Sequence, residues 1–249
     1  MKILITGGAG FIGSHLADAL VSKGHEVTIV DNLSSGTKKF IPRDAEFIET
    51  DIRSDKLISL FESRHFDVVY HEAAQTMVPV SIRYPKFDAE ENIIGLLNVL
   101  ESARKTDVQK IIFSSSAAIY GDNSNLPLAE NELPAPTSFY GLTKWMTERY
   151  LTLYHSLFNL NYTVLRYSNV YGPRQGANGE GGVIYLFAKA LSQNQKITIL
   201  GNGKQTRDFI SVHDVVSANV SALTHGHQNI FNVSTGSEIS IQHLALKMV

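Results

Sequence analysis

The sequence predicts an α/β fold in which a parallel sheet is covered by helices on both faces, a doubly wound arrangement. Three observations carry this prediction. Segments with strand-like and helix-like patterns alternate along the chain up to about residue 165. The strand-like segments are short, mostly continuous apolar runs, as expected for strands that are buried on both faces. The first of them, at residues 2–5, leads through a glycine-rich turn into a segment with helical spacing of apolar residues.

The individual elements follow from this alternation. The sequence predicts strands at residues 2–5, 25–30, 46–49, 67–70, 110–113 and 162–165. It predicts helices at residues 11–20, after residue 54, around residues 93–100 and at 142–158. After residue 167 it predicts a glycine-rich loop at 172–182, a helix from 183, a strand at 197–200, a helix from 213 and a last helix from 240. We therefore expect a nucleotide-binding domain at 1–167 and a smaller lobe at 168–249 that packs on it.

The glycine-rich turn, Thr6-Gly7-Gly8-Ala9-Gly10-Phe11-Ile12-Gly13, is the most informative stretch. Backbone N–H groups and the positive end of a helix dipole face outward at such a turn, which suits an anion such as a pyrophosphate. The next predicted strand ends at Asp31, where a carboxylate accepts hydrogen bonds from the hydroxyls of an adenosine ribose and repels a 2′-phosphate. This combination predicts a Rossmann dinucleotide-binding fold that uses NAD rather than NADP.

Three polar side chains are expected at the carboxyl edge of the sheet, where ligands of open α/β sheets bind. Ser116 follows the fifth strand, and Tyr140 and Lys144 are spaced to lie side by side on a helix. A nearby ammonium and a positively charged nicotinamide would favour the phenolate of Tyr140, whose pKa must fall by about three units for it to act as a base. Ser116 would hydrogen-bond to the same substrate hydroxyl. A second Tyr-x-x-x-Lys pair, Tyr185 and Lys189, lacks a serine partner, so we do not interpret it as catalytic.

Composition disfavours several other classes of function. The net charge is −2 and no basic run exceeds Lys38-Lys39, so we expect no nucleic-acid partner. The chain has no cysteine, which excludes disulfides and thiolate chemistry and fits a cytoplasmic protein. No apolar stretch is long enough to span a membrane, so we expect no membrane partner. The stretch His71-Glu72-Ala73-Ala74-Gln75 lacks the second histidine of a zinc-protease helix, and we expect no metal site.

Taken together, these residues resemble the extended short-chain dehydrogenase/reductase family. Within it the chain is most similar to the nucleotide-sugar branch, and closest there to the UDP-glucose 4-epimerases. The resemblance extends over almost the whole chain. Beyond the glycine turn, Asp31 and the Ser/Tyr/Lys set, it rests on Thr50-Asp51-Ile52, His71-Glu72-Ala73-Ala74-Gln75, Asn92, Leu165-Arg166-Tyr167-Ser168-Asn169-Val170-Tyr171-Gly172-Pro173-Arg174 and Thr206-Arg207-Asp208-Phe209-Ile210.

The resemblance implies a role for each matching residue. The NAD-binding residues would be Gly7, Gly10, Phe11, Ile12, Gly13, Asp31, Asn32, Ser35, Gly36, Asp51, Ile52, Ala73, Asn92, Ser114, Tyr140, Lys144 and Tyr167. The adenine would contact Asp51 and Ile52. The nicotinamide half would be lined by Ala73, Ser114 and Tyr167, with Lys144 at its ribose. A UDP-sugar would bind to Ser116, Asn169 and Arg207, the last two at its diphosphate.

The implied reaction is epimerisation at C4 of a UDP-hexose by transient oxidation to a 4-keto sugar. Three alternatives stay open: a nucleotide-sugar 4,6-dehydratase, a UDP-N-acetylhexosamine 4-epimerase and a non-catalytic NAD-binding sensor. Dehydratases of this family carry an Asp-Glu pair where this chain has Ala117 and Ala118, which argues against dehydration. The choice of sugar, and of UDP over TDP, is left open. The resemblance also implies a homodimer, and a substrate lobe that is truncated at Val249, because relatives usually continue through several more elements.

Overall fold

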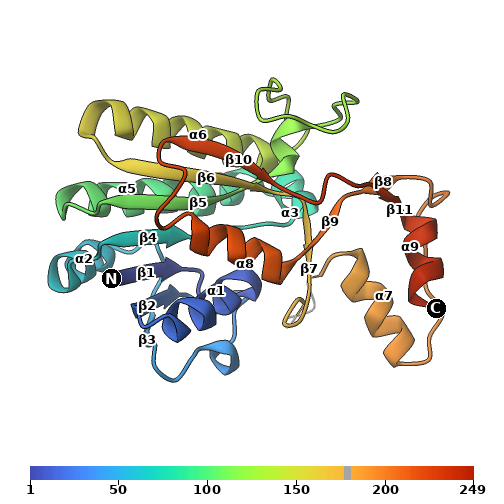
Figure 1. The fold of residues 1–249 in the computed structure, drawn as a ribbon, viewed down its shortest axis with the longest axis horizontal. Helices are drawn as coiled ribbons and strands as arrows, with labels where there is room; N and C mark the ends of the chain where they lie inside the picture. The colour runs from blue at the N-terminus through green and yellow to red at the C-terminus, as the bar shows by residue number, and fades with distance from the viewer. Residues whose placement is uncertain (177–180) are drawn as a thin grey trace.

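A computed structural model describes residues 1–176 and 181–249. Seven parallel strands form one sheet in the order β10-β6-β5-β4-β1-β2-β3 (Figure 1). The strands are β1 (Lys2–Thr6), β2 (Glu26–Asp31), β3 (Glu46–Glu49), β4 (Val68–His71), β5 (Lys110–Ser116), β6 (Asn161–Tyr167) and β10 (Asn229–Val233). The direction of strand addition reverses between β1 and β4. The carboxyl ends of these central strands therefore border one crevice, where ligands of such sheets bind.

Helices cover both faces of this sheet (Figure 1). One face carries α1 (Phe11–Ser22) and α8 (Val212–Ser221), which pack against each other. The other face carries α2 (Lys56–Arg64), α5 (Gly95–Lys105) and α6 (Phe139–Phe158). Each helix presents an apolar stripe to the sheet, as its sequence spacing requires. The doubly wound parallel sheet that the sequence predicts is confirmed.

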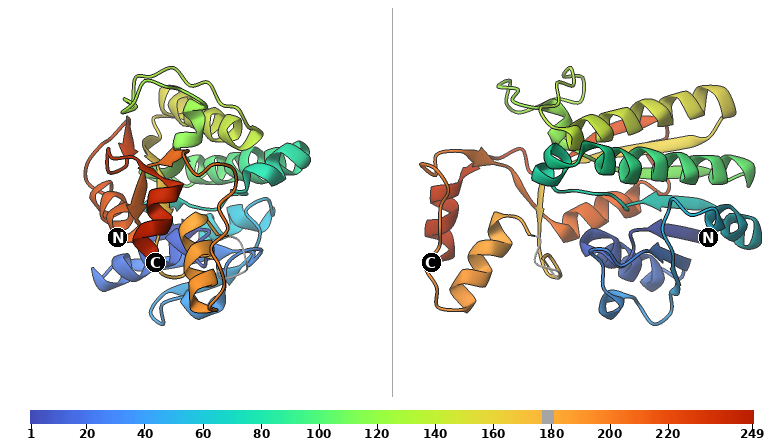
Figure 2. Two further views of the ribbon diagram at one scale, coloured as in Figure 1. Left: turned by 90° about the vertical axis from the view of Figure 1, so that its right-hand side faces the viewer. Right: turned by 180° about the vertical axis from the view of Figure 1, so that it is seen from behind.

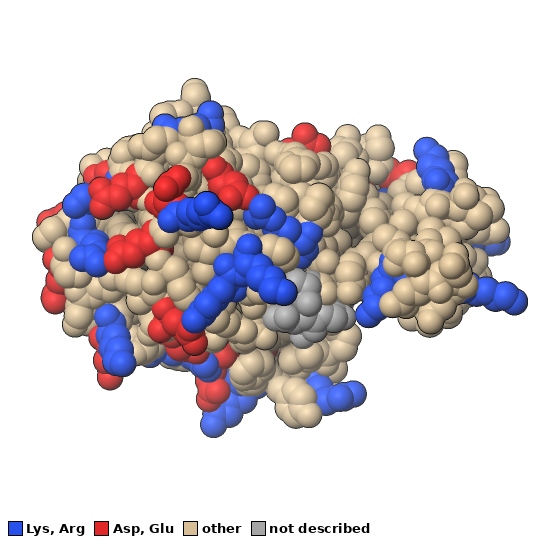
Figure 3. Space-filling model, turned by 90° about the horizontal axis from the view of Figure 1, so that it is seen from below, with Lys and Arg blue, Asp and Glu red and all other residues tan. Residues whose placement is uncertain are grey.

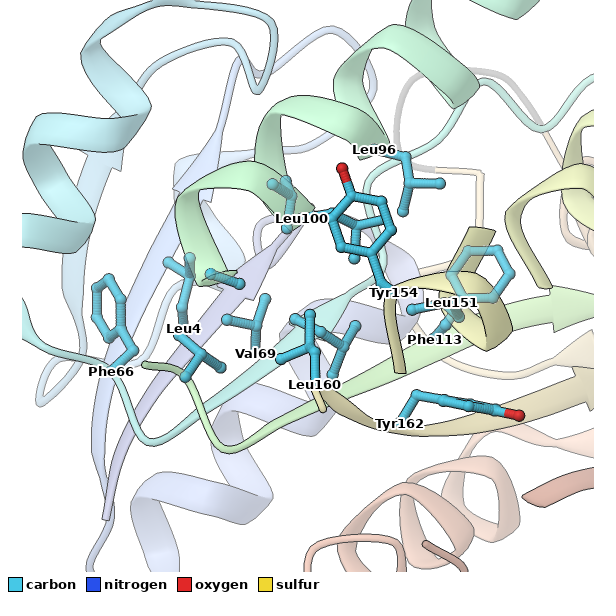
Figure 4. Packing of buried hydrophobic residues seen from close by; sticks show 14 of the residues in the cluster. Leu4, Phe66, Val69, Leu96, Leu100, Phe113, Leu151, Tyr154, Leu160 and Tyr162 are labelled. Carbon is cyan, nitrogen blue, oxygen red and sulfur yellow. The ribbon is translucent and has the colours of Figure 1, made fainter. Parts of the chain in front are cut away.

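The larger hydrophobic core lies between the sheet and the second group of helices (Figure 4). Apolar side chains from strands and helices interdigitate in it, and most of them are fully buried. The labelled members are Leu4, Phe66, Val69, Leu96, Leu100, Phe113, Leu151, Tyr154, Leu160 and Tyr162. Because burial of each such side chain stabilises the fold by about 1.5–3 kcal/mol, this layer holds β5 and α6 firmly side by side.

Short elements complete the main body. After α3 (Val78–Arg83), α4 (Pro85–Ala89) and one π-helical stretch (Glu90–Ile94) lead without a break into α5. Short 3₁₀ turns follow β2 and β5, at Lys38–Phe40 and Ala117–Tyr120. Within the described residues, no helix is long and apolar enough to cross a membrane.

The remaining elements form a small lobe beside the main body (Figure 2). It contains α7 (Val183–Ser192), α9 (Ile241–Met248) and the two-stranded sheet of β8 (Thr206–Arg207) and β11 (Ile239–Ser240). Two further paired strands, β7 (Asn169–Tyr171) and β9 (Phe209–Ser211), connect it to the body. Its own small core consists of Phe187, Ile241, Leu244 and Ala245. Residues 168–249 are thus divided in space, because α8 and β10 belong to the main body.

The sequence prediction differs from the structure in the strands after β6, since the short strands β7, β8, β9 and β11 are not predicted. The expected strand at 197–200 has no regular structure; instead Ile197 and Ile199 pack onto the core of the small lobe. The sequence did not predict β10, because Asn229 and Asn232 interrupt its apolar run. An edge strand needs fewer apolar side chains than a central strand. The predicted capped helix after Ser240 is confirmed, since the Ser240 hydroxyl accepts a hydrogen bond from the His243 N–H at 3.2 Å.

Charged side chains of both signs are interspersed over the main body on the face shown in Figure 3. Exposed ion pairs of this protein include Lys38 with Glu49 and Arg64 with Glu46. Exposed pairs of this kind contribute little to stability, about 1 kcal/mol or less each. The mixed pattern is typical of a solvated surface.

Candidate active site

A cavity of about 570 Å³ opens over the carboxyl ends of the central strands. Its wall combines the glycine turn with residues that follow β2 and β4 and with residues of β5, β6 and α6. The sequence-predicted site residues that line it are Gly7, Gly10, Phe11, Ile12, Gly13, Asp31, Asn32, Ser35, Ile52, Ala73, Ser116, Tyr140, Tyr167 and Asn169. Its volume is within the range of pockets that hold small ligands and cofactors. One cavity therefore brings together most of the residues predicted to bind cofactor and substrate.

The turn between β1 and α1 has room for backbone only. Gly7 has a φ of +70°, a left-handed conformation that favours glycine. A Cβ atom on Gly13 would lie 2.4 Å from the carbonyl oxygen of Gly7, so α1 packs directly on the turn. Gly10 is the N-cap of α1, and no acidic side chain occupies the first turn of this helix. The N–H groups and the positive helix end are therefore available to an anion such as a pyrophosphate.

Asp31 lies at the end of β2, beside this turn. Its Oδ2 accepts a hydrogen bond from the Ala9 N–H at 3.0 Å, and its Oδ1 accepts one from the Leu33 N–H at 2.7 Å. Burial raises the pKa of the Asp31 carboxyl, and the two N–H donors oppose this shift. Each carboxylate oxygen keeps a further lone pair for a ligand hydroxyl. This geometry suits the adenosine ribose that the sequence predicts here.

Asn32 and Asp51 lie together at the same end of the cavity. The Asn32 side-chain amide donates to Oδ2 of Asp51 at 2.9 Å. Hydrogen bonds from Arg53 hold the pKa of Asp51 well below its usual range. Asn32 and Ile52 line the cavity, whereas Asp51 is not part of the lining.

The loop after β2 is held against the glycine turn by backbone contacts. A Cβ atom on Gly36 would approach the backbone of Ala9 to 3.0 Å, and the Thr37 N–H donates to the Ala9 carbonyl at 3.0 Å. Ser35 lines the cavity from this loop. Ser35 and Gly36 are therefore close to the expected pyrophosphate and ribose positions.

Ser116, Tyr140 and Lys144 come together although a long loop separates β5 from α6. Ser138 caps α6 through its side-chain oxygen and so sets the first turn, which carries Tyr140. The Ser116 hydroxyl lies near the Tyr140 phenol, where it lowers the pKa of that group and opposes the effect of burial. The Lys144 Nζ lies 5.9 Å from the centre of the Tyr140 ring and donates to the carbonyl oxygen of Ser114 at 2.7 Å. The arrangement predicted from residue spacing is present in the fold.

The polypeptide alone does not make Tyr140 a base at neutral pH. Burial raises the pKa of Tyr140 to about 12, a shift that the Ser116 hydrogen bond opposes and Asp88 increases. Burial lowers the pKa of Lys144 to about 8, and acidic neighbours, first among them Glu72, oppose that shift. The expected lowering of the Tyr140 pKa by Lys144 is thus not a property of the protein by itself. A positively charged nicotinamide, if bound beside Tyr140, would lower the pKa of this phenol.

Glu72 is a cavity residue that sequence reasoning missed. It follows β4 and lines the cavity, where its Oε1 accepts hydrogen bonds from the hydroxyls of Ser114 and, at 3.5 Å, of Tyr167. Burial raises the pKa of Glu72, whereas the Ser114 hydroxyl and the Lys144 ammonium oppose this shift. The available signal is a lone acid at the carboxyl end of an apolar strand, within a stretch that the zinc comparison and the family resemblance both include without giving Glu72 a role.

Three predicted cofactor residues, Ser114, Asn92 and Lys144, lie just behind the lining. The Ser114 hydroxyl is 2.9 Å from the Tyr167 hydroxyl. Asn92 accepts a hydrogen bond from the Gln75 N–H at 2.8 Å and donates one to Thr143 of α6 at 3.2 Å. Asn92 thus joins the segment after β4 to the catalytic helix. In this structure its position is that of a supporting residue.

Asn169 and Arg207 face a second cavity, of about 410 Å³. Ser168 and Asn169 line both cavities, so the two adjoin. Arg207 lines only the second cavity; it is exposed and forms no ion pair with another described residue. Ala117, which directly follows Ser116, also lines the second cavity. A ligand that spans the two cavities would place one end at Ser116 and a charged group at Arg207.

Comparison with known proteins identifies the family. Residues 3–234 match the NAD dependent epimerase/dehydratase family. The chain belongs to this family. Its fold is similar to the UDP-glucose 4-epimerase of Thermotoga maritima solved with UDP-glucose, with 44% identity, a TM-score of 0.97, and coverage of 99% of this chain and 81% of that one.

Two other solved structures are also similar to this chain. The Thermus thermophilus UDP-glucose 4-epimerase in complex with NAD has 36% identity and a TM-score of 0.94, with 99% of this chain and 81% of that chain covered. The UDP-N-acetylglucosamine 4-epimerase of Methanobrevibacter ruminantium, solved with UDP-N-acetylmuramic acid, has 36% identity and a TM-score of 0.93, with 98% and 80% covered.

These relatives confirm the predicted family, the predicted NAD cofactor and the predicted class of enzyme, an NAD-dependent nucleotide-sugar epimerase. The site fits that cofactor. A Cβ atom at Gly7 or Gly13 would collide with neighbouring backbone, so these two positions have the tight turn and the close packing of helix on strand that a dinucleotide-binding turn requires. The roles of the individual residues stay predictions.

Proposed function

We propose that this protein interconverts the C4 epimers of a UDP-hexose, with Tyr140 as the residue that moves the sugar proton. The observation that supports this proposal is that Tyr140 and Ser116 line the same cavity as the glycine turn and Asp31, with Lys144 just behind the lining and 5.9 Å from the Tyr140 ring centre. A non-catalytic NAD sensor would not need a serine and a lysine arranged around a buried phenol.

The proposed mechanism assigns one task to each residue. When bound, NAD supplies the hydride acceptor that the oxidation of C4 requires. The glycine turn and Asp31 would hold its adenosine diphosphate, and Lys144 its nicotinamide ribose. Tyr140 would take the proton of the sugar 4-hydroxyl, and Ser116 would orient that hydroxyl through a hydrogen bond. After the keto sugar has rotated so that its opposite face meets the cofactor, Tyr140 would return the proton.

Turning of the sugar requires a firm hold on the diphosphate and a loose hold on the hexose. Arg207 and Asn169 would provide the firm hold, since a guanidinium makes strong charge-assisted hydrogen bonds to phosphate oxygens. The two adjoining cavities would leave space in which the sugar ring can rotate. Ala117 follows Ser116 and offers no acid for dehydration, so we place epimerisation ahead of a 4,6-dehydratase reaction.

The sharpest test of this function is the pair Tyr140→Phe and Tyr185→Phe. Each variant removes one phenolic oxygen from a Tyr-x-x-x-Lys pair, but Tyr185 does not line the cavity. Because general acid–base groups contribute about 10²–10⁴ in rate, Tyr140→Phe should lose at least ~100-fold in turnover and keep its NAD. Tyr185→Phe should keep turnover. Equal activity in the two variants would overturn the assignment.

Chromatography of the products would test the sugar. Incubation with UDP-galactose should yield UDP-glucose, and a parallel incubation with UDP-N-acetylgalactosamine would reveal the N-acetylhexosamine activity that the sequence left open. A 4-keto-6-deoxy product would instead indicate a dehydratase. The absence of any product, together with binding of NAD, would favour the sensor.

We also propose that two copies pair through the face of α6 that carries exposed apolar side chains. Leu142, Met146, Leu153 and Leu157 recur at helical spacing and are 38% to 63% exposed. Exposed apolar patches of this kind mark interaction sites, and the family resemblance implies a homodimer. Leu157→Glu should convert a dimer into a monomer in sedimentation experiments, whereas Leu133→Glu, on an exposed loop, should not. A cytoplasmic location, suggested by the absence of cysteine, is part of the same proposal.

A further inference from the structure

Glu72 is an acidic group in the cavity that the proposed mechanism leaves unused. It follows β4, which lies between β1 and β5 in the sheet. The glycine turn is therefore on one side of it and the serines of β5 are on the other. Its Oε1 is held by the Ser114 hydroxyl, and the Tyr167 hydroxyl approaches it at 3.5 Å. These contacts fix the carboxyl group at the cavity wall.

The position of Glu72 differs from that of the other acids in the lining. Among the described residues that line this cavity, the acidic ones are Asp31, Glu72 and Glu91. Glu91 forms an ion pair with Arg53 at 2.8 Å and so lies at the end where Asp31 and Asp51 are. Glu72 instead shares Ser114 with Lys144, which donates to the Ser114 carbonyl at 2.7 Å. Glu72 is thus the acid at the catalytic end.

We propose that Glu72 lies beside the nicotinamide of bound NAD and stabilises its oxidised, positively charged form relative to the neutral reduced form. The inference rests on the proposed function, because that function places the nicotinamide at the catalytic end. A negative group beside a ring that gains or loses a positive charge favours the charged ring. The Ser114 hydroxyl keeps this group in place, and the Lys144 ammonium is held on the carbonyl oxygen of the same serine.

This effect would serve an enzyme that must return the hydride it takes. In the first half-reaction the C4–H bond of the sugar breaks and its electron pair moves with the hydrogen to the nicotinamide, while the 4-hydroxyl proton goes to Tyr140. In the second half-reaction both return to the sugar, so the cycle is redox-neutral. By favouring the oxidised form of the cofactor, Glu72 would promote return of the hydride to the sugar in the second half-reaction. The keto sugar would then have less time to dissociate.

Equilibrium binding tests this inference without any turnover. Dissociation constants for NAD⁺ and for NADH are measured by fluorescence titration of the apoprotein form of the wild type, Glu72→Gln and Glu91→Gln. The ratio of the NAD⁺ constant to the NADH constant should rise about tenfold in Glu72→Gln, equivalent to about 30 mV in the potential of the bound two-electron couple. It should stay within about twofold in Glu91→Gln, which removes an acid at the other end.

The outcomes separate this inference from the proposed function. If the wild type binds both cofactor forms but the ratio is the same in Glu72→Gln, the role of Glu72 is wrong and the epimerase proposal stands. If the wild type binds neither form, the proposed function fails first. Thermal melting checks the fold of each variant, and Glu72→Ala, which should raise the ratio as well, carries the test if the glutamine variant does not fold. A purely packing role would weaken both cofactor forms equally and leave the ratio unchanged.

Discussion

The two ends of the main cavity are built in different ways. The adenosine end uses residues close together in the chain, from Gly7 to Ile52, and its contacts are mainly to backbone. The catalytic end collects side chains from β4, β5, α6 and β6, which are far apart in the sequence. Its groups are held by buried side-chain hydrogen bonds rather than by a turn. One end therefore depends on backbone conformation, and the other on tertiary packing.

This difference has a consequence for stability. At the catalytic end, Glu148 pairs with Arg166 at 2.7 Å, and both side chains are at most 4% exposed. Ser115, next to Ser116, donates to Glu148 at 2.5 Å. The same helix carries Lys144 about one turn and Tyr140 about two turns earlier, so this buried pair helps to align β5 with α6. Substitutions here should damage the whole fold, whereas substitutions at the adenosine end should mainly damage the turn.

The largest expected effect comes from the buried pair. Glu148→Gln leaves the Arg166 charge buried without its partner, which should cost about 3–5 kcal/mol in the free energy of unfolding. Glu101→Gln disrupts the more exposed pair of Glu101 and Arg104 and should cost about 1 kcal/mol or less. Urea unfolding followed by circular dichroism measures both. A similar loss in the free energy of unfolding for the two variants would contradict the expected difference between the buried and the exposed ion pair.

A second prediction concerns the pH dependence of stability. The pKa of Lys144 is about 8 in the folded protein and about 10.4 when unfolded, so between these values the folded state binds fewer protons. Burial of the charged Lys144 therefore lowers the stability of the folded state at pH 8 and below. This cost disappears as the pH rises toward 10.4. Wild type should gain on the order of 3 kcal/mol over this range relative to Lys144→Met. Lys189→Met, on an exposed side chain, should behave as wild type. Denaturant unfolding at pH 7.5 and 10 provides the measurement, and a parallel pH dependence of wild type and Lys144→Met would refute it.

A third prediction concerns two substitutions in the glycine turn, at the adenosine end of the cavity. In Gly13→Ala the new methyl group would meet the Gly7 carbonyl at 2.4 Å, which should cost about 1–3 kcal/mol and abolish tight NAD binding. In Gly10→Ala the corresponding distance is 3.2 Å, so stability should change little while NAD affinity falls. Thermal melting and NAD titration of the two variants distinguish these effects. Unchanged melting of Gly13→Ala would show that the turn can move.

The smallest effect is expected for cofactor choice. Asp31→Asn keeps an acceptor for the Ala9 N–H but removes the charge that repels a 2′-phosphate. The preference for NAD over NADP should fall about tenfold, as expected for loss of one charged hydrogen-bonding group. Glu49→Gln, at the exposed end of β3, should keep the preference. Titration of each variant with both cofactors tests this, and an unchanged preference in Asp31→Asn would point to another discriminating residue.

The local parts of this protein could be predicted from the sequence. The glycine turn, Asp31 and the six strands through β6 each depend on a few neighbouring residues, because turn conformation and burial of a short apolar run are local properties. The spacing of Tyr140 and Lys144 likewise follows from the pitch of one helix. The edge strand β10 escaped prediction since its position beside β6 is what makes it a strand.

The tertiary structure decided the chemistry around those residues. Whether Glu72 meets Ser114, whether Asn92 lines the cavity or supports it, and how burial and acidic neighbours set the pKa of Tyr140 and Lys144 all depend on distances between segments that the chain separates widely. Sequence spacing specifies neighbours along one helix or one turn. Desolvation and charge pairing arise only when distant elements pack together, so only the folded structure could determine them.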